Sequence, residues 1–330
     1  MLSINKCLTK IINMKFLKFI TMSFCLSMLC FATSSCNNGK KTTSEKQKTE
    51  IEEASKLETD SEQDRIGGFL PKIPYNNKTV NLNDFTVTIR NFDVYGFPKK
   101  METYGTLFAI MEGVPNEFVN EVAVTFHQMF PKDASLDLKK QEEVLSAMLQ
   151  YKSLIPVLKG RYESLGEDFE QSMEKLSSDY SVCDIIMYKD GTGRQTMEVV
   201  EHLLHFITSI GLHLNSPKEW SFSDADSEAA EVMNKAIELG LYDISGYADM
   251  LEEKEIHQRV IVQEFAYWLI STYWNLQEPY GNIQEREWNI DNKKQLLEKL
   301  PEGYNLVKST IDSIMTAPSK EALDKFIKYN

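Results

Sequence analysis

The sequence predicts an α+β fold in which a mixed α/β part at about residues 75–190 precedes a helical part at about residues 191–330. Short apolar runs with a strand-like pattern alternate with segments of helical spacing in the first part. After Asn215 the apolar residues recur at helical spacing, and the sequence gives no strong strand signal. About 255 residues are enough to bury one sizeable core. We therefore expect a single domain over residues 75–330.

The two patterns also give approximate boundaries for each element. In the first part, strands are expected at residues 84–96, 106–113, 154–158 and 182–188, and helices at residues 115–130, 137–151 and 161–176. In the second part, helices are expected at residues 194–215, 226–239, 252–276 and 293–300, followed by two short helical segments around Val307 and Leu323. A small sheet is thus expected to precede most of the helices along the chain.

The start of the chain has the layout of a targeting segment. Four lysines precede an apolar run at residues 19–32, and three small residues connect that run to Cys36. The run is too short for a membrane-spanning helix, which needs about 20 apolar residues. This order resembles a bacterial lipoprotein signal, which implies removal of residues 1–35, lipid attached to Cys36 and tethering to a membrane of the cell envelope. The alternative is an ordinary cleaved signal that leaves Cys36 unmodified.

Residues 36–74 are expected to form a disordered tether between the lipid and the domain. Residues 37–66 have no aromatic side chain and consist largely of Lys, Glu, Ser and Thr, so they cannot bury enough apolar surface to offset chain entropy. The net charge is −13, and loss of the four signal lysines makes it −17, which makes nucleic acid a poor partner. Cys183 is the one cysteine beyond Cys36, so no disulfide framework is expected.

The segment from Arg194 to Asn215 has three of the five histidines of the chain within twelve residues. Its apolar residues recur at three- and four-residue spacing, which predicts an amphipathic helix. Glu201 and His205 are four residues apart and lie within about 40° of each other on one face, with His202 on its flank. Converging carboxylate and imidazole groups can bind a divalent metal. The alternative is a half-buried polar stripe whose hydrogen bonds are satisfied within the protein.

A second polar pair lies in the segment from Glu253 to Trp274. His257 and Glu264 are seven residues apart, so both share one face of the expected helix. Glu264 is surrounded by aromatic residues in the sequence, and a carboxylate in such a setting needs a cation or another partner. A metal ion and a structural salt bridge both satisfy this requirement.

Two stretches together resemble the zincin metallopeptidases, of the gluzincin type. They are Glu201-His202-Leu203-Leu204-His205 and, some sixty residues later, Gln263-Glu264-Phe265-Ala266. In that family an H-E-x-x-H helix is completed by a glutamate from a later helix, and the order of elements matches over about residues 85–290. Here the first two motif residues are exchanged. The same stretches, with Glu287-Trp288, are also similar to uncharacterised exported bacterial proteins that contain E-x-x-x-H and E-[FY]-x-Y-W.

The zincin resemblance implies a metal bound by Glu201, His205 and Glu264, with a fourth position left for water and His202 as the catalytic base. Zinc is the expected metal, although two carboxylates and one imidazole form a harder site that also suits other divalent ions. His202 as a ligand beside His205, with Glu201 or Glu198 as the base, remains an alternative. The expected function is a membrane-tethered metal-dependent hydrolase acting on peptides. The competing hypothesis is a non-catalytic lipoprotein with a zincin-like scaffold that binds a partner.

Overall fold

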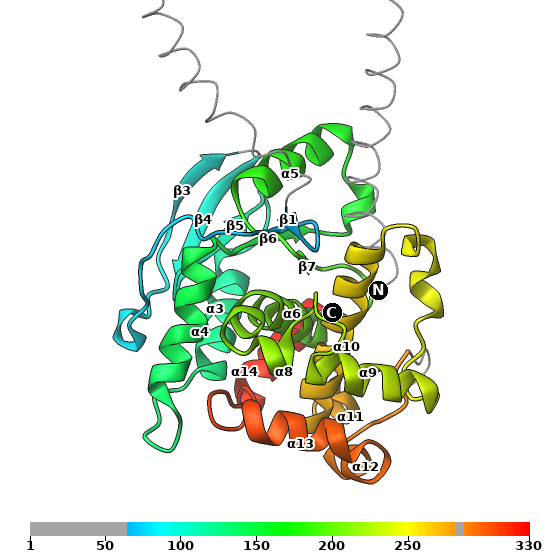
Figure 1. Cartoon of the computed structure of the whole chain (residues 1–330). Coiled ribbons are helices and arrows are strands. Elements are labelled where there is room, and N and C mark those ends of the chain that lie inside the picture. Colours follow the sequence, from blue (N-terminus) through cyan, green and yellow to red (C-terminus); the bar gives the residue numbers. More distant parts are fainter. Residues whose placement is uncertain (1–64, 95, 282–286) are drawn as a thin grey trace, which may run out of the picture.

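The chain folds as a mixed sheet that is followed by helices, so the predicted α+β class is confirmed. Figure 1 shows the computed structural model of the protein, which describes residues 65–94, 96–281 and 287–330. The predicted signal segment, Cys36 and the tether up to residue 64 lie outside the described residues. Within the described ranges, no helix combines the length and apolar character needed to cross a membrane.

The central sheet has five strands that are neighbours in both sequence and space. The strands are β3 (Ile89–Val94), β4 (Phe97–Thr103), β5 (Thr106–Ile110), β6 (Leu154–Lys159) and β7 (Ile186–Tyr188). The first three strands pair antiparallel through short turns, whereas β5, β6 and β7 pair parallel. Parallel neighbours need crossover connections, which explains why helices separate the last three strands along the chain.

Helices cover both faces of this sheet (Figure 1). On one face lies α5 (Glu167–Asp179), whose Met173 and Leu176 pack with Leu107 and Leu158 of the strands. The opposite face carries the larger core, formed with α3 (Asn116–Met129), α4 (Leu138–Gln150) and α6 (Gln195–Phe206). The expected helices at residues 115–130 and 137–151 are therefore confirmed almost to the residue.

The second half of the protein is helical. After α6 come a π-helical segment (Ile207–Leu212), α7 (His213–Asn215), α8 (Pro217–Trp220), α9 (Glu228–Glu238), a 3-10 segment (Ser245–Met250), α10 (Lys254–Tyr273), α11 (Gln277–Tyr280), α12 (Lys293–Lys299), α13 (Pro301–Thr310), α14 (Lys320–Asp324) and a last 3-10 turn (Lys325–Tyr329). Helix α10 is buried along most of its length, because the other C-terminal helices surround it.

Several boundaries differ from the sequence prediction for local reasons. Strand β4 was not expected, because Pro98 and two lysines interrupt its apolar pattern, yet Met101 and Thr103 are buried on the core side. Helix α5 begins at Glu167, after a 3-10 turn at Tyr162–Ser164 and the N-cap Gly166. The expected helix at residues 194–215 is helical throughout, but α6 ends at Phe206 and continues as a π-helix.

The folded body begins earlier than expected, so residues 65–74 of the predicted tether belong to it. Strands β1 (Arg65–Ile66) and β2 (Leu70–Pro71) form a small antiparallel hairpin, and Phe69 and Leu70 are buried. Arg65 fixes the hairpin by donating hydrogen bonds to the carbonyl oxygens of Phe69, Ser178 and Tyr180. Two apolar side chains and one well-bonded arginine thus order a segment that we expected to belong to the tether.

Candidate metal centre

Three elements bring together a cluster of buried acids and histidines. Helix α6 packs against α10, and Asp184, which lies just before β7, contacts residues of both helices. Helix α6 contributes Glu198, Glu201, His202 and His205, α10 contributes Glu264, and Asp184 precedes β7. The four α6 residues are three or four positions apart, so they lie on one side of that helix. All six side chains are buried, and the most exposed of them, Glu198, retains 9% of its surface.

Two overlapping groups within this cluster have the geometry to hold a metal ion. One group is Glu201, His205 and Glu264, which is the predicted ligand set, and the other is Asp184, His202 and His205. Within each group the potential ligand atoms all lie within 4.8 Å of one another. The three residues that the sequence analysis selected as ligands therefore lie close together, although they come from helices some sixty residues apart.

The two nitrogens of His205 face different partners. Its Nδ1 lies 2.7 Å from Asp184 Oδ2, and because a carboxylate accepts, this nitrogen donates the hydrogen bond. In neutral His205 the lone pair is then on Nε2, which lies 3.5 Å from Glu264 Oε2. This Nε2 atom is buried and has no hydrogen-bond partner among the described residues. A carboxylate behind one imidazole nitrogen is the arrangement that orients metal-binding histidines.

His202 lies next to the same Asp184 carboxylate. Its Nδ1 lies 2.5 Å from the backbone oxygen of Glu198, one turn earlier, and therefore donates to it. Its Nε2 lies 3.5 Å from Asp184 Oδ1. Both nitrogens thus point at oxygen acceptors, which suits a protonated imidazolium between two acids. The role of His202 as a base stays a prediction, but these contacts are those of a buried cation.

The acidic residues of α6 resist ionisation because of their burial. Burial raises the pKa of Glu201 to about 8, and the neighbouring charge of Glu264 adds to this rise. Burial also raises the pKa of Glu198 to about 7, although the backbone N–H of Met187 donates to its Oε1 at 2.7 Å. A cation placed among these carboxylates would therefore replace protons that they hold at neutral pH.

The pKa values of His202 and His205 are raised, although burial alone would lower them. Burial alone would lower the pKa of His202, but the carboxylates of Glu198 and Asp184 outweigh it and raise the pKa to about 9. The pKa of His205 also lies well above its usual value, because Glu264 and Asp184 outweigh the effect of burial. The pKa of Asp184 is lowered in return, since the two histidines outweigh its own desolvation. In the metal-free protein, protons held by the histidines and by Glu201 therefore offset the negative charge of the buried carboxylates.

The sequence analysis did not identify Asp184, and it named Gln263 without the role that both have in holding His205. Asp184 Oδ2 accepts a second hydrogen bond from Gln263 Nε2 at 3.2 Å, and its Oδ1 accepts from the backbone of Ile185 at 2.8 Å. The available signal was an acidic residue inside the apolar run at residues 182–188. A carboxylate in such a run is expected to be buried and therefore to need partners.

A further carboxylate, that of Glu287, contacts α10 at Trp268, one turn after Glu264. The side chains of Tyr247 and Trp268 both donate hydrogen bonds to Glu287 Oε1, at 2.6 and 3.2 Å. Trp268 is four residues after Glu264, so Glu287 approaches the same side of the helix. Glu287 is half-buried, unlike the six cluster residues, and burial together with the charge of Glu264 raises its pKa to about 7. Glu287 is thus more exposed than any of the six cluster residues.

Other histidine, cysteine and acidic side chains of the described residues lie outside the two metal-binding groups. His257 is half-buried and belongs to neither group, although it shares α10 with Glu264. Burial raises the pKa of the Cys183 thiol, which fits packing rather than nucleophilic chemistry. His127 stacks on Phe85 and contacts the Tyr104 hydroxyl through Nδ1. Asp224 accepts from the backbone of Asp226 in the turn before the N-cap Ser227.

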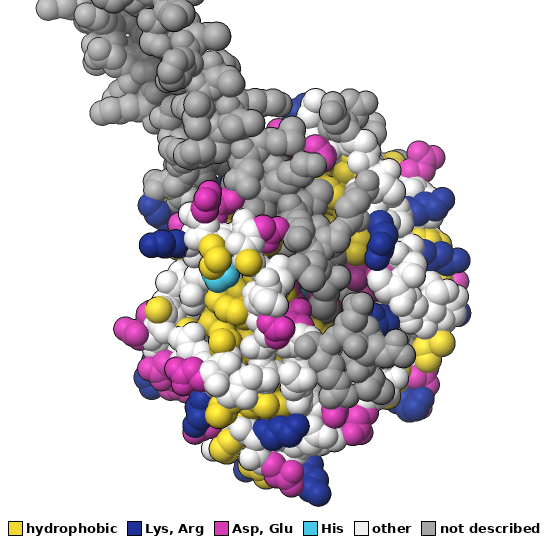
Figure 2. Space-filling model, turned by 90° about the vertical axis from the view of Figure 1, so that its right-hand side faces the viewer, with side chains coloured by type: hydrophobic (Ala, Val, Ile, Leu, Met, Phe, Trp, Pro, Cys, Tyr) yellow, Lys and Arg dark blue, Asp and Glu magenta, His cyan; other side chains and the backbone are white. Residues whose placement is uncertain are grey.

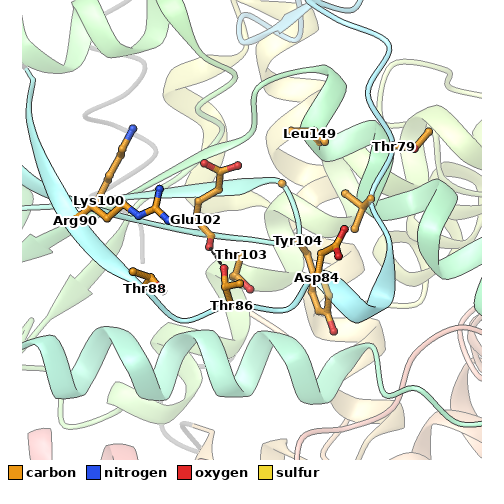
Figure 3. Close-up of a pocket in the computed structure, with 12 residues that line it drawn as sticks. Thr79, Asp84, Thr86, Thr88, Arg90, Lys100, Glu102, Thr103, Tyr104 and Leu149 are labelled. Atoms are coloured by element: carbon orange, nitrogen blue, oxygen red, sulfur yellow. Dashed lines mark hydrogen bonds between the residues drawn. The ribbon is translucent and has the colours of Figure 1, made fainter.

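The outer surface of the described residues has a polar groove, which is separate from the buried cluster. A groove of about 320 Å³ lies beside the β3–β4 hairpin. It is lined by threonines and by charged side chains of both signs such as Asp84, Arg90 and Lys100 (Figure 3). Its lining residues are distinct from those of the buried cluster. On the face seen in Figure 2, acidic and basic side chains are interspersed among polar and apolar ones. The cluster is thus an internal feature of the fold.

Comparisons of the chain with models of known protein families, with curated proteins and with solved structures found no match.

Proposed function

We propose that this protein is a membrane-tethered lipoprotein that binds one zinc ion through Glu201, His205 and Glu264 and uses it to hydrolyse peptides. The observation that carries the proposal is that potential ligand atoms of these three buried residues all lie within 4.8 Å of one another. Without a metal, protons on Glu201 and His205 offset the charge of this group, and a divalent cation can replace those protons. The zincin resemblance supports the same three ligands.

The chemistry of this donor set suits zinc. Zinc accepts imidazole nitrogen together with carboxylate oxygen, and catalytic sites keep three protein ligands and an open fourth position. A zinc ion held there would act as a Lewis acid that makes water acidic near neutral pH. The group of Asp184, His202 and His205 is less suitable, because the Nδ1 of His205 already donates to Asp184 at 2.7 Å. Asp184 fits better as the group that orients His205.

For proton transfer, partial exposure and a pKa near neutrality favour Glu287 over His202. A general base must be able to accept a proton near the operating pH, and it must reach water. Glu287 is half-buried and held by Tyr247 and Trp268, and burial raises its pKa to about 7. His202 is buried between Glu198 and Asp184. We therefore propose that Glu287 takes the proton of water and that His202 balances the charge of the acids.

Elemental analysis combined with a peptide library tests this proposal. The purified protein is expected to contain close to one zinc ion and to cleave peptides only while the metal is present. Glu287→Gln is expected to keep the metal and to lose about 10²- to 10⁴-fold in rate, as is typical for a general base. Glu278→Gln, in the exposed helix α11, is the matched control. A parent protein without metal would contradict the zinc site. Cleavage that Glu287→Gln leaves unchanged would contradict the role of Glu287 as the base.

The lipid anchor is the second component of the proposal, and it rests on the residue order that ends at Cys36. A diacylated cysteine carries two acyl chains, which suffice for stable membrane attachment. Cys36→Ala is therefore expected to move the protein from the membrane fraction to the soluble fraction of the cell. Cys183→Ala, which alters the buried thiol, is the control and should leave fractionation unchanged. Continued membrane fractionation of Cys36→Ala would exclude the anchor.

A non-catalytic role is the second candidate, and one observation favours it. All three proposed ligands keep at most 4% of their side-chain surface exposed, so a peptide cannot reach them without movement of the surrounding residues. A structural zinc would stabilise the contact between α6 and α10 without any reaction. Stoichiometric zinc together with complete inactivity toward the peptide library would select this role over the hydrolase.

A further inference from the structure

We propose that the N-terminal hairpin, residues 65–71, controls the geometry of the metal centre through Arg259, which acts as a positioning residue. The inference rests on the proposed metal site and adds a means of regulating it. The hairpin is the part of the body nearest in sequence to the predicted lipid anchor. It contacts α10 at Glu255 and Arg259, nine and five residues before Glu264, and a continuous series of contacts connects it to His205.

The hairpin fits closely over Arg259. Gly67 has φ of +59°, and a Cβ added there would lie 2.8 Å from Arg259 Cδ and 2.8 Å from a ring carbon of Phe222. The backbone N–H of Gly67 donates to Glu255 Oε1 at 3.2 Å, which fixes the turn to the start of α10. The ring of Phe69 lies 5.3 Å from the guanidinium carbon of Arg259 and covers its charge. Arg259 itself is buried, with 3% of its surface exposed.

Arg259 in turn holds the groups that orient His205. Its NH1 donates to Gln263 Oε1 at 3.0 Å and to the backbone oxygen of Cys183 at 3.3 Å. With its oxygen fixed in this way, Gln263 presents Nε2 to Asp184 Oδ2 at 3.2 Å. The same carboxylate oxygen accepts from His205 Nδ1 at 2.7 Å. Arg259 therefore fixes both Gln263 and the backbone next to Asp184.

Undocking of the hairpin would therefore weaken the contacts that orient His205, the proposed metal ligand. Without the hairpin, Arg259 loses the ring that covers it and becomes accessible to water, so its hydrogen bonds compete with solvent. Gln263 and Asp184 then orient His205 less strictly. Contacts behind a metal ligand typically contribute a factor of about 10 to 100 in metal affinity. By thermodynamic linkage, metal binding must strengthen hairpin docking by the same factor.

Gly67→Ala tests this coupling in the full mature chain. The variant should bind zinc about 10- to 100-fold more weakly than the parent, as measured by competition with a chromophoric chelator. Gly240→Ala is the matched control, because Gly240 has φ of +66° but open space where the Cβ would lie. It introduces similar backbone strain without touching Arg259 and should bind zinc as the parent does. Equal affinities for the two alanine variants would overturn the inference.

Two further measurements separate positioning from general destabilisation. Cobalt-substituted Arg259→Lys should have an altered visible absorption spectrum, because lysine keeps the charge but cannot form the two directed hydrogen bonds. In the parent, adding zinc should slow amide hydrogen exchange in residues 65–71. Unchanged exchange there, with zinc bound, would contradict the coupling even if a variant failed to fold. A parent that binds no metal would refute the proposed function itself, which is a different result.

Discussion

His205 and His213 lie on one continuous helical segment, yet their surroundings are opposite. His205 contacts Asp184 and Glu264, and these carboxylates raise its pKa well above the usual value. His213 stacks on Phe222 with ring centroids 4.2 Å apart, and burial lowers its pKa to about 4. Two identical residues eight positions apart therefore favour opposite protonation states. The difference teaches that burial of a histidine does not define its chemistry until its neighbours are known.

The largest expected effect comes from replacing His205, because the proposal makes it a metal ligand. His205→Ala should reduce zinc content from about one ion per chain to near zero and weaken affinity more than about 100-fold, beyond the loss typical of an outer contact. His213→Phe, which preserves an aromatic ring against Phe222, is the control from the same segment. Elemental analysis of both variants measures the result. Loss of zinc from both would show that the segment acts through folding alone.

The second effect concerns His202, which the structure places between Glu198 and Asp184. His202→Ala removes a buried cation and leaves its acids uncompensated, which typically costs about 3–5 kcal/mol in unfolding free energy. We expect a clear loss of stability in denaturant titrations of the metal-free variant. A variant with parental stability and metal content but no hydrolysis would instead support the role of His202 as the base.

The third effect is the pH dependence of the metal-free protein. Folding raises the pKa values of Glu198, Glu201 and His202 to about 7, 8 and 9, from ordinary values of 4.5, 4.5 and 6.5. At pH values between a group's ordinary pKa and its raised pKa, the folded state binds more protons than the unfolded state. The unfolding free energy therefore falls as pH rises. The unfolding free energy should fall by on the order of a few kcal/mol between pH 5 and pH 9.

Saturating zinc should reverse this trend, because zinc displaces the same protons and binds more tightly as pH rises. Thermal melts with chelator and with zinc, taken across this pH range, measure both slopes. Parallel slopes would indicate that zinc does not bind at these carboxylates.

The smallest expected effect concerns His213 and has the opposite sign. Its pKa is lowered to about 4 from 6.5 by burial, so its contribution to stability is present above pH 6.5 and is lost as pH falls toward 4. Its buried Nδ1 also has no hydrogen-bond partner among the described residues. His213→Phe should therefore lose on the order of 1–3 kcal/mol less stability than the parent between pH 7 and pH 4. Denaturant titrations at the two pH values provide the comparison, and identical acid sensitivity would contradict it.

The sequence by itself determined the parts of this protein that depend on spacing along one element. Helical periodicity predicted helices over residues 194–215 and 252–276 and placed Glu201 and His205 on one face, and the structure confirms both helices and the proximity of these two residues. The alternation of strands and helices determined the fold class for the same reason. Strand β4 and the N-terminal hairpin were missed, because polar residues there conceal a few side chains that become buried only in the assembled fold.

Only the tertiary structure decided which residues complete the centre and what their charges are. Asp184, Gln263 and Arg259 lie on two separate elements, and no spacing within either one indicates that they meet beside His205. The protonation of His202, His205 and His213 depends on desolvation and on charges from distant segments, and these act over a few ångströms of space. Periodicity fixes a side chain's direction from its own helix, whereas its neighbours are fixed by how the helices pack.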